Sequence, residues 1–595
     1  MRSALGAFLL GFAGVASMPS IVLAEAIPVE LKQTETGWQL SRGGDPYFIR
    51  GAGGDASMSD LVAAGANSIR TWDADGIDDR LDEAHRLGLS VTVGIWLGHE
   101  RHGFDYQDAA QVRKQFERAR EMVLRYKDHP AVLLWGVGNE MEGFEAGDDP
   151  AIWRAVNDIA AMIKELDPHH PTMTVTAEIG GARISSVHER CPDIDIHGIN
   201  SYGGGPSLVE RYRKGGGSKP IVLTEFGPPG AWEVPKNAWG VPPEPTSTEK
   251  AAFYRQTYET SIAGAPGLAL GGYAFTWGSK MEATATWFGM FLPDGSRLGA
   301  VDVMTELWSG RPPADLAPTV EPLTVAGEPE AAPGDELEVR AVVADPEGGA
   351  LRAQWALRPE SSEYVTGGDF RAMMPDIEGA VLDGGPEGAK IRLPQEPGPY
   401  RLFLYAYDEG GNAATANVPL LVKGERRTPL PFHVYRDGFE GMPWVPSGWS
   451  GATDELTLDG QNQDGPYEGE ASIKMRFTGE VGWVSVAWQH PANNWGDQDG
   501  GFDLTGATAL DFRARGAYGG ERIDFGVGLI GDDKPHPDSG KKMVKGTVLE
   551  REWQRYSVPL RGLEMSSIKT GFVVTLVARR GSAVTVYLDD IRFVR

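Results

Sequence analysis

Short apolar runs alternate with amphipathic, helix-like stretches through the first half of the chain, and this alternation predicts its fold. Eight apolar runs recur between residues 30 and 312, at 47–52, 68–72, 90–97, 132–139, 172–177, 194–202, 221–226 and 268–277. Eight strand–helix units in roughly 280 residues are the size of a (β/α)8 barrel. The competing fold is a doubly wound open sheet, and the lack of a G-x-G-x-x-G motif after the first strand counts against it.

The pattern changes where the barrel is predicted to end, at residue 313. Residues 314–335 are rich in Pro, Ala, Glu and Gly, which is typical of a linker. Residues 336–424 contain short strand-like runs between turns, which predict a β-sandwich of about 100 residues. The pieces ADPEGG at 344–349 and AYDEGG at 406–411 resemble immunoglobulin-like or cadherin-like modules.

A second β-rich block covers residues 430–595. Its ending, VYLDDIRF at 586–593, resembles the last strand of jelly-roll carbohydrate-binding modules, and DLTGA at 503–507 resembles another part of them. The predicted architecture is therefore a (β/α)8 barrel at 27–313, followed by two all-β domains, an immunoglobulin-like sandwich and a jelly-roll sandwich.

The first residues are typical of a secretory signal peptide, predicted as 1–24. Arg2 supplies the positive charge, an apolar stretch spans 4–15, and small residues surround Ala24. The apolar stretch is too short for a confident membrane span, and no other segment approaches ~20 apolar residues. We therefore expect an exported protein, periplasmic or extracellular, with no membrane span after cleavage of the signal.

Composition narrows the range of partners. The 595 residues suggest several domains, and 78 Gly with 41 Pro suggest many turns. The formal net charge of −27 argues against nucleic acid or an anionic membrane and fits a neutral ligand such as a polysaccharide. Acidity that only keeps a secreted protein soluble is an equal alternative. The single cysteine, Cys191, excludes an internal disulfide and is expected to be a buried, inert thiol.

Two glutamates each close a strand-like apolar run. Glu140 ends the fourth run and Glu225 lies at the end of the seventh. A carboxylate at the end of a buried strand is costly, so it invites a functional explanation. Cleavage of a glycosidic bond requires two carboxyl groups, one on each side of the anomeric carbon. In a barrel, the ends of these strands meet at one face, where such chemistry takes place.

The run from His129 to Glu140, HPAVLLWGVGNE, closely resembles the acid/base strand of glycoside hydrolase family 2. The broader resemblance is to the retaining barrel hydrolases that include family 5. It implies Glu140 as the acid/base and Glu225 as the nucleophile. In family 2 a sugar-binding sandwich and an immunoglobulin-like domain usually precede the barrel, whereas here the β-rich segments follow it. The substrates of the usual members are therefore not carried over.

The same resemblance assigns supporting roles. Arg70 matches the arginine that supports the nucleophile, and Tyr202 matches the tyrosine that donates a hydrogen bond to it. Trp277 matches the tryptophan that lines the sugar subsite, and Asn139 is placed to bind a sugar hydroxyl. Each has a structural alternative: a salt bridge for Arg70, and core packing for the two aromatic residues. The further cleft candidates lie at or just beyond strand ends, and they are Trp72, Trp96, His99, Glu142, Glu178, Trp232 and Trp239.

Chemistry of the residues agrees with these roles. The apolar residues that lead to Glu140, Trp135 among them, would shield its carboxyl group from water, which favours the neutral acid form. Glu225 must be ionised to attack, and a nearby Arg70 would stabilise that charge. A retaining enzyme would hold the two carboxyl groups about 5–5.5 Å apart. The structural alternative for Glu140 is a carboxylate at the start of a helix, and for Glu225 it is an ion pair.

No catalytic metal or other cofactor is expected. The pairs His99/His102 and His169/His170 lack the H-E-x-x-H pattern and a third ligand. The jelly-roll resemblance leaves a structural calcium ion in the last domain open. Tryptophans in that block are candidates for a glycan platform where they fall in loops rich in Gly, Pro and Asp, namely Trp444, Trp449 and Trp495. Trp483 and Trp488 lie in strands, and we expect them in the core.

Taken together, the sequence predicts an exported retaining glycoside hydrolase that acts on a β-linked neutral glycan, such as a β-glucan. The predicted partner is a polysaccharide or an oligosaccharide. Two alternatives remain open. A transglycosylase would use the same two carboxylates but pass the sugar to another sugar. A non-catalytic glycan-binding protein would keep the barrel as a lapsed enzyme.

Overall fold

The computed structural model describes residues 25–143, 145–361, 364, 373–424, 428–439, 441–579 and 582–595. The predicted signal segment, 1–24, lies outside them. These residues form two compact units, one ending at residue 423 and the other consisting of 396–398 with 424–595. None of the described helices is both long and apolar enough to cross a membrane.

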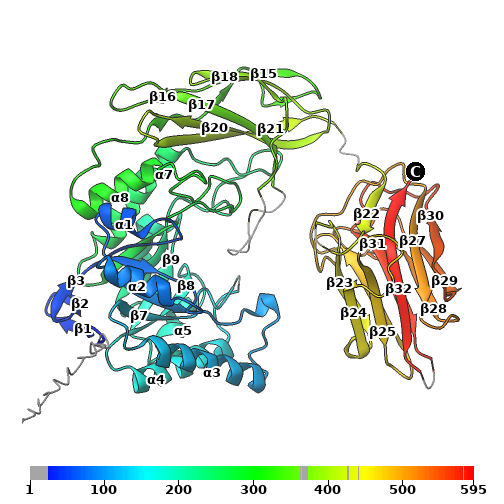
Figure 1. Cartoon of the computed structure of the whole chain (residues 1–595), viewed down its shortest axis with the longest axis horizontal. Helices are drawn as coiled ribbons and strands as arrows, with labels where there is room; N and C mark the ends of the chain where they lie inside the picture. Colours follow the sequence, from blue (N-terminus) through cyan, green and yellow to red (C-terminus); the bar gives the residue numbers. More distant parts are fainter. Residues whose placement is uncertain are drawn as a thin grey trace, which may run out of the picture. The chain divides into compact units, whose positions relative to one another are not determined.

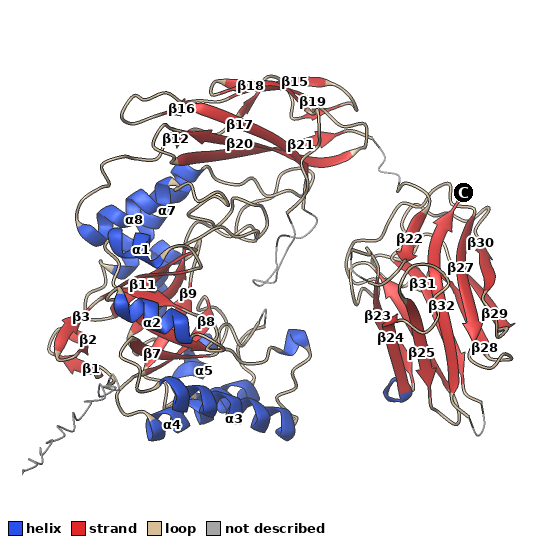
Figure 2. Ribbon diagram, viewed as in Figure 1, coloured by secondary structure: helices blue, strands red, loops and turns tan. Residues whose placement is uncertain are grey.

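A closed barrel of eight parallel strands forms the first part of the first unit (Figures 1 and 2). Its strands are β4 (Ile49–Gly53), β5 (Ser68–Arg70), β6 (Ser90–Ile95), β7 (Val132–Val137), β8 (Thr172–Ala177), β9 (Ile196–Asn200), β10 (Ile221–Phe226) and β11 (Ala269–Phe275). Neighbours in this order pair with one another, and β11 closes the barrel against β4. The predicted TIM barrel is confirmed, with each strand inside or overlapping a predicted run.

Helices fill the connections between these strands. They are α1 (Met58–Ala63), α2 (Asp78–Arg86), α3 (Ala109–Tyr126), α4 (Pro150–Leu166), α5 (Arg183–Arg190), α6 (Leu208–Lys214), α7 (Ser247–Thr257) and α8 (Gly299–Ser309). The start of α4 shows how the sequence sets their ends. The Asp149 side chain accepts a hydrogen bond from the Ala151 N–H, and Pro150 occupies the first turn, where its missing donor has no cost.

A three-stranded antiparallel sheet precedes the barrel, formed by β1 (Val29–Thr34), β2 (Gly37–Arg42) and β3 (Asp45–Tyr47). Its Val29 and Leu40 are buried in one cluster with barrel residues such as Leu133 and Val222. Val29 and Leu133 come from the amino-terminal portions of their elements. The sheet therefore covers the barrel core at the amino-terminal ends of the strands. The carboxyl ends lie at the opposite end of the barrel and remain available for a site.

The all-β part of the first unit contains β12 (Thr319–Val320), β13 (Thr324–Val325), β14 (Glu330–Ala331), β15 (Glu336–Arg340), β16 (Val343–Ala344), β17 (Arg352–Pro359), β18 (Val381–Gly385), β19 (Gly388–Arg392), β20 (Gly398–Tyr407) and β21 (Ala413–Val422). Two four-stranded sheets, β13-β15-β19-β18 and β14-β21-β20-β17, form the predicted sandwich. The prediction of a linker at 314–335 is wrong, because β12, β13 and β14 pair with strands of this domain.

The sandwich is joined to the barrel by specific contacts. Helix α7 packs against β21 and β12. The Thr415 N–H donates to Ser247 Oγ at 2.9 Å, and the Val320 N–H donates to Thr248 Oγ1 at 2.8 Å. Arg297, in the connection after β11, donates from Nε to Asn412 Oδ1 at 2.9 Å. The two domains therefore share a polar, hydrogen-bonded boundary.

The second unit is a two-sheet sandwich. Its strands are β22 (Phe432–Tyr435), β23 (Val445–Gly451), β24 (Leu456–Asn462), β25 (Ser472–Phe477), β26 (Trp483–Gln489), β27 (Ala509–Gly516), β28 (Arg522–Val527), β29 (Lys542–Val548), β30 (Gln554–Pro559), β31 (Thr570–Val577) and β32 (Val584–Val594). One sheet has the order β24-β25-β32-β27-β30, with β22 also beside β32, and the other has the order β23-β26-β31-β28-β29. A continuous apolar core fills the space between them.

Candidate active site at the carboxyl ends of the barrel strands

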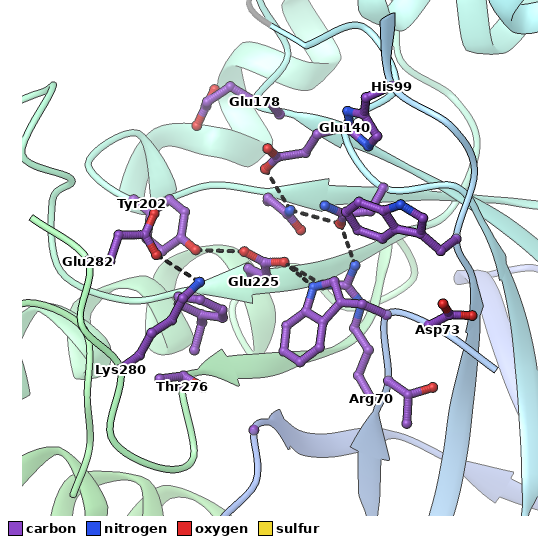
Figure 3. A pocket seen from close by; sticks show the side chains of 18 of the residues that line it. Arg70, Asp73, His99, Glu140, Glu178, Tyr202, Glu225, Thr276, Lys280 and Glu282 are labelled. Carbon is purple, nitrogen blue, oxygen red and sulfur yellow. Dashed lines mark hydrogen bonds and ion pairs between the residues drawn. The ribbon is translucent and has the colours of Figure 1, made fainter. Parts of the chain in front are cut away.

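A cleft of about 1000 Å³ opens where the barrel strands end (Figure 3). Both predicted glutamates line it, Glu140 just after β7 and Glu225 within β10. Arg70, at the end of β5, and Tyr202, just after β9, line it as well. Strands β5, β7 and β10 are buried along their whole length and run parallel, which brings the polar side chains at or just beyond their carboxyl ends, Arg70, Glu140 and Glu225, to the same end of the barrel.

Glu225 is held by three side-chain donors. Arg70 Nη1 and Trp72 Nε1 both donate to Glu225 Oε1, at 2.9 and 2.7 Å, and the Tyr202 hydroxyl donates to Oε2 at 2.6 Å. The Arg70–Glu225 ion pair is buried, with 3% and 8% of the two side chains exposed. Hydrogen bonds to the charged form stabilise a carboxylate, and a cation beside it adds to that effect. These contacts fix the orientation of the Glu225 carboxyl group.

Glu140 lies in a different environment. It receives one side-chain hydrogen bond, from Asn200 Nδ2 to its Oε1 at 2.7 Å. Burial and, next to it, the negative charge of Glu225 raise the pKa of Glu140 to about 8, against the lowering effect of the bond from Asn200. Glu140 therefore carries a proton at neutral pH. The two carboxyl groups of the cleft thus have different surroundings, with three side-chain donors at Glu225 and one at Glu140.

A continuous chain of hydrogen bonds joins the two glutamates. Asn200 Nδ2 donates to Glu140 Oε1 and also to Asn139 Oδ1, the latter at 3.2 Å. Asn139 Oδ1 accepts a second bond, at 2.6 Å, from Arg70 Nη2, and Arg70 Nη1 in turn reaches Glu225. Asn139 is thus placed between the acid and the nucleophile candidates, with its Oδ1 occupied by protein donors.

The backbone at Glu140 is unusual for a residue with a side chain. Its φ of 52° lies in the left-handed region, and Glu178, after the next strand, has a φ of 62°. Such conformations cost about 1–3 kcal/mol and persist only where the surroundings impose them. At Glu140 the main-chain N–H is fixed by a 2.9 Å bond to Val175 O on β8, which aims the side chain into the cleft.

The remaining strand-end candidates divide into two groups. Trp72, Trp96 and Glu178 line the cleft, as predicted, together with His99 and Trp232. Trp72 fits there because Gly53 leaves room, since a Cβ at Gly53 would lie 2.6 Å from the indole. Glu178 is paired with Arg211, whose Nη1 donates to Glu178 Oε2 at 2.6 Å. The Trp96 ring stacks on His99, with a centroid distance of 5.0 Å.

Three candidates lie elsewhere. Trp277 does not line the cleft: its side chain is 1% exposed, and its Nε1 donates to Ser57 O at 3.1 Å. The aromatic side chain that β11 contributes to the cleft is Phe275, two residues earlier. Glu142 is buried behind the cleft and accepts a 2.8 Å bond from Arg183 Nε, and Trp239 is also outside the lining.

Sequence reasoning missed Asn200, Lys280 and Glu282. Asn200 is the last residue of β9, so its strand-end position was a usable signal. Lys280 and Glu282 line the cleft from the connection after β11, form an ion pair at 2.9 Å, and lie beside Tyr202 (Figure 3). That connection has no regular spacing of apolar residues, so the sequence does not predict which of its side chains reach the cleft.

The tryptophans of the last domain are arranged differently from the prediction in two cases. Trp449 and Trp495 are 39% and 38% exposed, which a glycan platform requires. Trp444 is 1% exposed and belongs to the core, against the prediction, because its loop folds back over Phe432, Phe502 and Phe593. The expected core position holds for Trp488, which is fully buried, but Trp483 is 47% exposed.

No group of three or more His, Cys, Asp or Glu side chains in the described part of the chain is arranged to hold a metal ion. Near the chain end, Asp589 Oδ2 accepts hydrogen bonds from the N–H groups of Tyr467 and Glu468. The calcium ion that the jelly-roll resemblance left open stays a prediction.

A (β/α)8 barrel with two glutamates in one cleft at its strand ends belongs to a class defined by paired-carboxylate chemistry. Residues 80–238 match the family model described as "Glycosyl hydrolases family 2, TIM barrel domain", and residues 433–595 match "Carbohydrate binding domain 30". The resemblance of the barrel to family 2, and of the last block to carbohydrate-binding modules, is thereby confirmed.

Curated relatives match a part of the chain. A probable mannan endo-1,4-beta-mannosidase C of Aspergillus terreus is 26% identical over 155 residues, which are 22% of this chain and 37% of the relative. A beta-glucuronidase of Sus scrofa is 30% identical over 167 residues, 26% of this chain and 23% of the relative. The chain thus spans well under half the length of each.

Among solved structures, a beta-D-glucuronidase of Dictyoglomus thermophilum aligns with a TM-score of 0.37 and 17% identity, covering 48% of this chain and 54% of that one. The beta-glucuronidase of Ruminococcus gnavus aligns with a TM-score of 0.38 and 16% identity, covering 48% and 53%.

Proposed function

We propose that this protein is a retaining glycoside hydrolase that cleaves β-glycosidic bonds, with Glu140 as acid/base and Glu225 as nucleophile. One observation carries the proposal: the two glutamates share one cleft and one hydrogen-bond chain, yet one is surrounded by donors and the other is held protonated. That difference is what a double displacement requires of its two carboxyl groups.

The first displacement begins with attack of a Glu225 carboxylate oxygen on the anomeric carbon. As the C–O bond to the leaving sugar breaks, Glu140 gives its proton to the departing oxygen, and a glycosyl ester of Glu225 forms. Arg70, Trp72 and Tyr202 hold the attacking carboxylate so that it meets the sugar in one orientation.

The second displacement releases the sugar. Glu140, now ionised, removes a proton from water, and the water oxygen attacks the anomeric carbon as the bond to Glu225 breaks. Glu225 leaves as a carboxylate and Glu140 is protonated again. Two inversions restore the original configuration. A sugar hydroxyl in place of water would give transglycosylation through the same steps.

The substrate that we propose is a β-linked neutral glycan. Acidic side chains outnumber basic ones along the described cleft lining, the acidic ones being Asp55, Asp73, Glu140, Glu178, Glu225, Glu233 and Glu282 and the basic ones Arg70, Arg80, Arg101, Arg183 and Lys280. This balance disfavours a uronic acid. The two relatives are named for different sugars, a mannan and a glucuronide, so they do not indicate which sugar this protein would accept.

The last domain supports a polymeric substrate. Its match to a carbohydrate-binding family agrees with a role in holding the enzyme on a glycan, which raises the local concentration of the barrel at the polymer. Three exposed tryptophans are the proposed contacts, Trp449, Trp483 and Trp495. We further propose export of the protein, on the strength of the signal-like residues 1–24.

The test is activity of the purified protein on β-glucans, mannans, xylans and aryl β-glycosides, with the products separated and their anomeric configuration followed by NMR. Wild-type protein should release a product that retains its configuration, and Glu225→Ala should lower kcat by at least about 10³-fold. Glu178→Gln, which alters a cleft carboxylate already paired with Arg211, is the matched control.

Three other results would each lead to a different conclusion. Products longer than the substrate would identify the transglycosylase. Glycan binding without any cleavage would favour the non-catalytic protein. An inverted product would contradict the nucleophilic role of Glu225, since an inverting enzyme uses the second carboxylate as a base.

A further inference from the structure

The cleft has one wall built from two long connections. The segment after β10 contributes Trp232 and Glu233, and the segment after β11 contributes Lys280 and Glu282. Trp232 is 45% exposed and packs edge-on against Tyr202, with ring centroids 5.8 Å apart. The two segments that bear these residues are called the wall segments below, and they comprise residues 227–246 and 276–288.

Glu244 ties the wall segments to each other. Its carboxylate, at the end of the first segment, accepts bonds from Thr284 Oγ1 at 2.5 Å and from Thr286 Oγ1 at 2.7 Å in the second. Lys250, at the start of α7, forms an ion pair with Glu244 and donates to Thr286 O at 2.7 Å. Glu244 and Lys250 are both buried, so this polar cluster is shielded from solvent.

The β-sandwich completes this cluster. Arg401, on β20, is 1% exposed, and its Nη2 donates to Pro242 O, in the first wall segment, at 2.8 Å. Its Nε and Nη1 donate to Glu360 Oε2 and Asn417 Oδ1, both at 2.8 Å, within the sandwich itself. All three guanidinium nitrogens of Arg401 therefore donate hydrogen bonds, two of them within the sandwich and one to the barrel.

A second contact brings the sandwich close to the nucleophile. Tyr364, from the sandwich, is buried in one apolar cluster with Tyr202, Phe288 and Trp287. Trp287 Nε1 donates to Pro229 O at 2.9 Å, which links the wall segments again. Tyr202, in the same cluster, is the donor to Glu225. The packing layer directly behind the candidate site is thus made by both domains.

We propose that the β-sandwich is a working part of the substrate cleft, with Arg401 as a positioning residue that holds the wall segments in the arrangement that binds a glycan chain. Buried ion clusters rarely add net stability compared with apolar packing, and their best-supported use is to select one conformation among several. Arg401 touches neither Glu140 nor Glu225 in the structure and acts on substrate through Trp232, Glu233, Lys280 and Glu282.

The consequence for catalysis, which rests on the proposed function, is that loss of Arg401 should affect long substrates and short substrates differently. Arg70 and Trp72 hold Glu225 from the end of β5 and the residues just after it, outside the wall segments, and they stay in place when the wall loosens. A small aryl glycoside needs only that region. A long glycan also needs the wall, so loss of Arg401 should raise KM for polymer and leave kcat for the aryl glycoside nearly unchanged.

The test variant is the double substitution Arg401→Met with Glu360→Gln, because removing Arg401 alone would leave a buried, unpaired carboxylate. The matched control is Arg297→Met, which breaks another hydrogen-bonded contact between the barrel and the sandwich, the one with Asn412. Hydrogen–deuterium exchange of full-length proteins is the first readout, since it needs no substrate.

We expect faster exchange in the wall segments of the double variant and not in those of Arg297→Met. We also expect KM for polymer to rise at least about fivefold, with kcat/KM for the aryl glycoside within about twofold of wild type. Unchanged exchange in the wall segments, the same pattern in Arg297→Met, or equal losses on both substrates would overturn the proposal. A wild-type protein without activity would count against the proposed function alone. The exchange measurement would still decide whether Arg401 positions the wall segments, because it needs no substrate.

Discussion

The Tyr202 hydroxyl donates a hydrogen bond to Glu225 Oε2 at 2.6 Å, from a ring that is 8% exposed at the edge of the cleft. Burial and the negative charge of Glu225 raise the pKa of Tyr202 well above its usual value, so the phenol stays protonated and remains a donor at neutral pH. A permanent donor at one carboxylate oxygen leaves the nucleophile with a fixed direction of attack.

Replacing Tyr202 with Phe should lower kcat by about 10- to 100-fold, because a hydrogen bond to a charged group contributes about 1.5–3 kcal/mol. Steady-state kinetics on an aryl glycoside measure this. The control is Tyr212→Phe, which removes another buried phenol that bonds to a main-chain oxygen, Lys219 O, away from the cleft. Equal losses in both variants would assign Tyr202 a packing role only.

The pH dependence of kcat/KM should show an alkaline limb controlled by Glu140. Its pKa of about 8, raised by burial and by the charge of Glu225, means that the proton needed by the leaving group is present below that pH and is lost above it. We expect kcat/KM to fall about tenfold per pH unit above the limb. In Glu140→Gln, assayed on an aryl glycoside whose leaving group needs no proton, the limb should be missing. An unchanged limb in that variant would assign it to another group.

The same shift predicts how stability changes with pH. The pKa of Glu140 is raised in the folded protein from a usual value of 4.5 to about 8, so the folded state binds this proton more tightly than the unfolded chain does. The resulting stabilisation is complete below pH 4.5, declines as the pH rises from 4.5 towards 8, and is gone above about 8. Glu140→Gln should therefore raise Tm relative to wild type by an amount that grows from pH 5 to pH 8, as measured by calorimetry. A constant difference would contradict the shift.

Sequence reasoning located the barrel and its two glutamates because both give strong local signals. Strands that are buried on both faces read as continuous apolar runs, as in β7 and β10, and a carboxylate at the end of such a run stands out. Asn139, Arg70 and Tyr202 lie at the same strand ends, where parallel geometry forces neighbouring side chains together.

What the sequence could not show is the direction of a single aromatic ring. Trp277 follows β11 by two residues and turns into the core, whereas Phe275 faces the cleft. Trp483 is the first residue of β26 and the only exposed one in that strand, and a strand that is otherwise buried throughout gives no alternation that would mark it. Strands of two residues, such as β12 and β13, have no period at all, so the segment at 314–335 was predicted to be a linker.

Asn200 is expected to tune Glu140. Its Nδ2 donates to Glu140 Oε1 at 2.7 Å, and this bond lowers the pKa of Glu140 against the stronger raising effect of burial. Asn200→Ala should therefore move the alkaline limb of kcat/KM to higher pH, and it should lower kcat several-fold because the acid is no longer oriented. The matched control is Asn157→Ala, which removes a side-chain bond to Asp193 on the barrel exterior. A lower kcat with no movement of the limb would mean that Asn200 acts by packing alone.

Tryptophans of the last domain should separate into binding and folding residues according to their exposure. Trp483 is 47% exposed and Trp449 is 39% exposed, so Trp483→Ala and Trp449→Ala should weaken retention on a glycan gel with little change in Tm. Trp488 is fully buried and Trp444 is 1% exposed, so Ala at either position should cost about 3–5 kcal/mol of folding free energy.

Affinity electrophoresis of full-length protein, paired with calorimetry, distinguishes the two kinds of tryptophan. The stacking of a sugar on an exposed indole is lost with the ring, while the core of the sandwich is left intact. If Trp483→Ala and Trp449→Ala bind glycan as wild type does, the glycan surface lies elsewhere on the domain. If they also lower Tm as much as Trp488→Ala, their rings stabilise the fold, and their exposure in the structure does not mark a binding site.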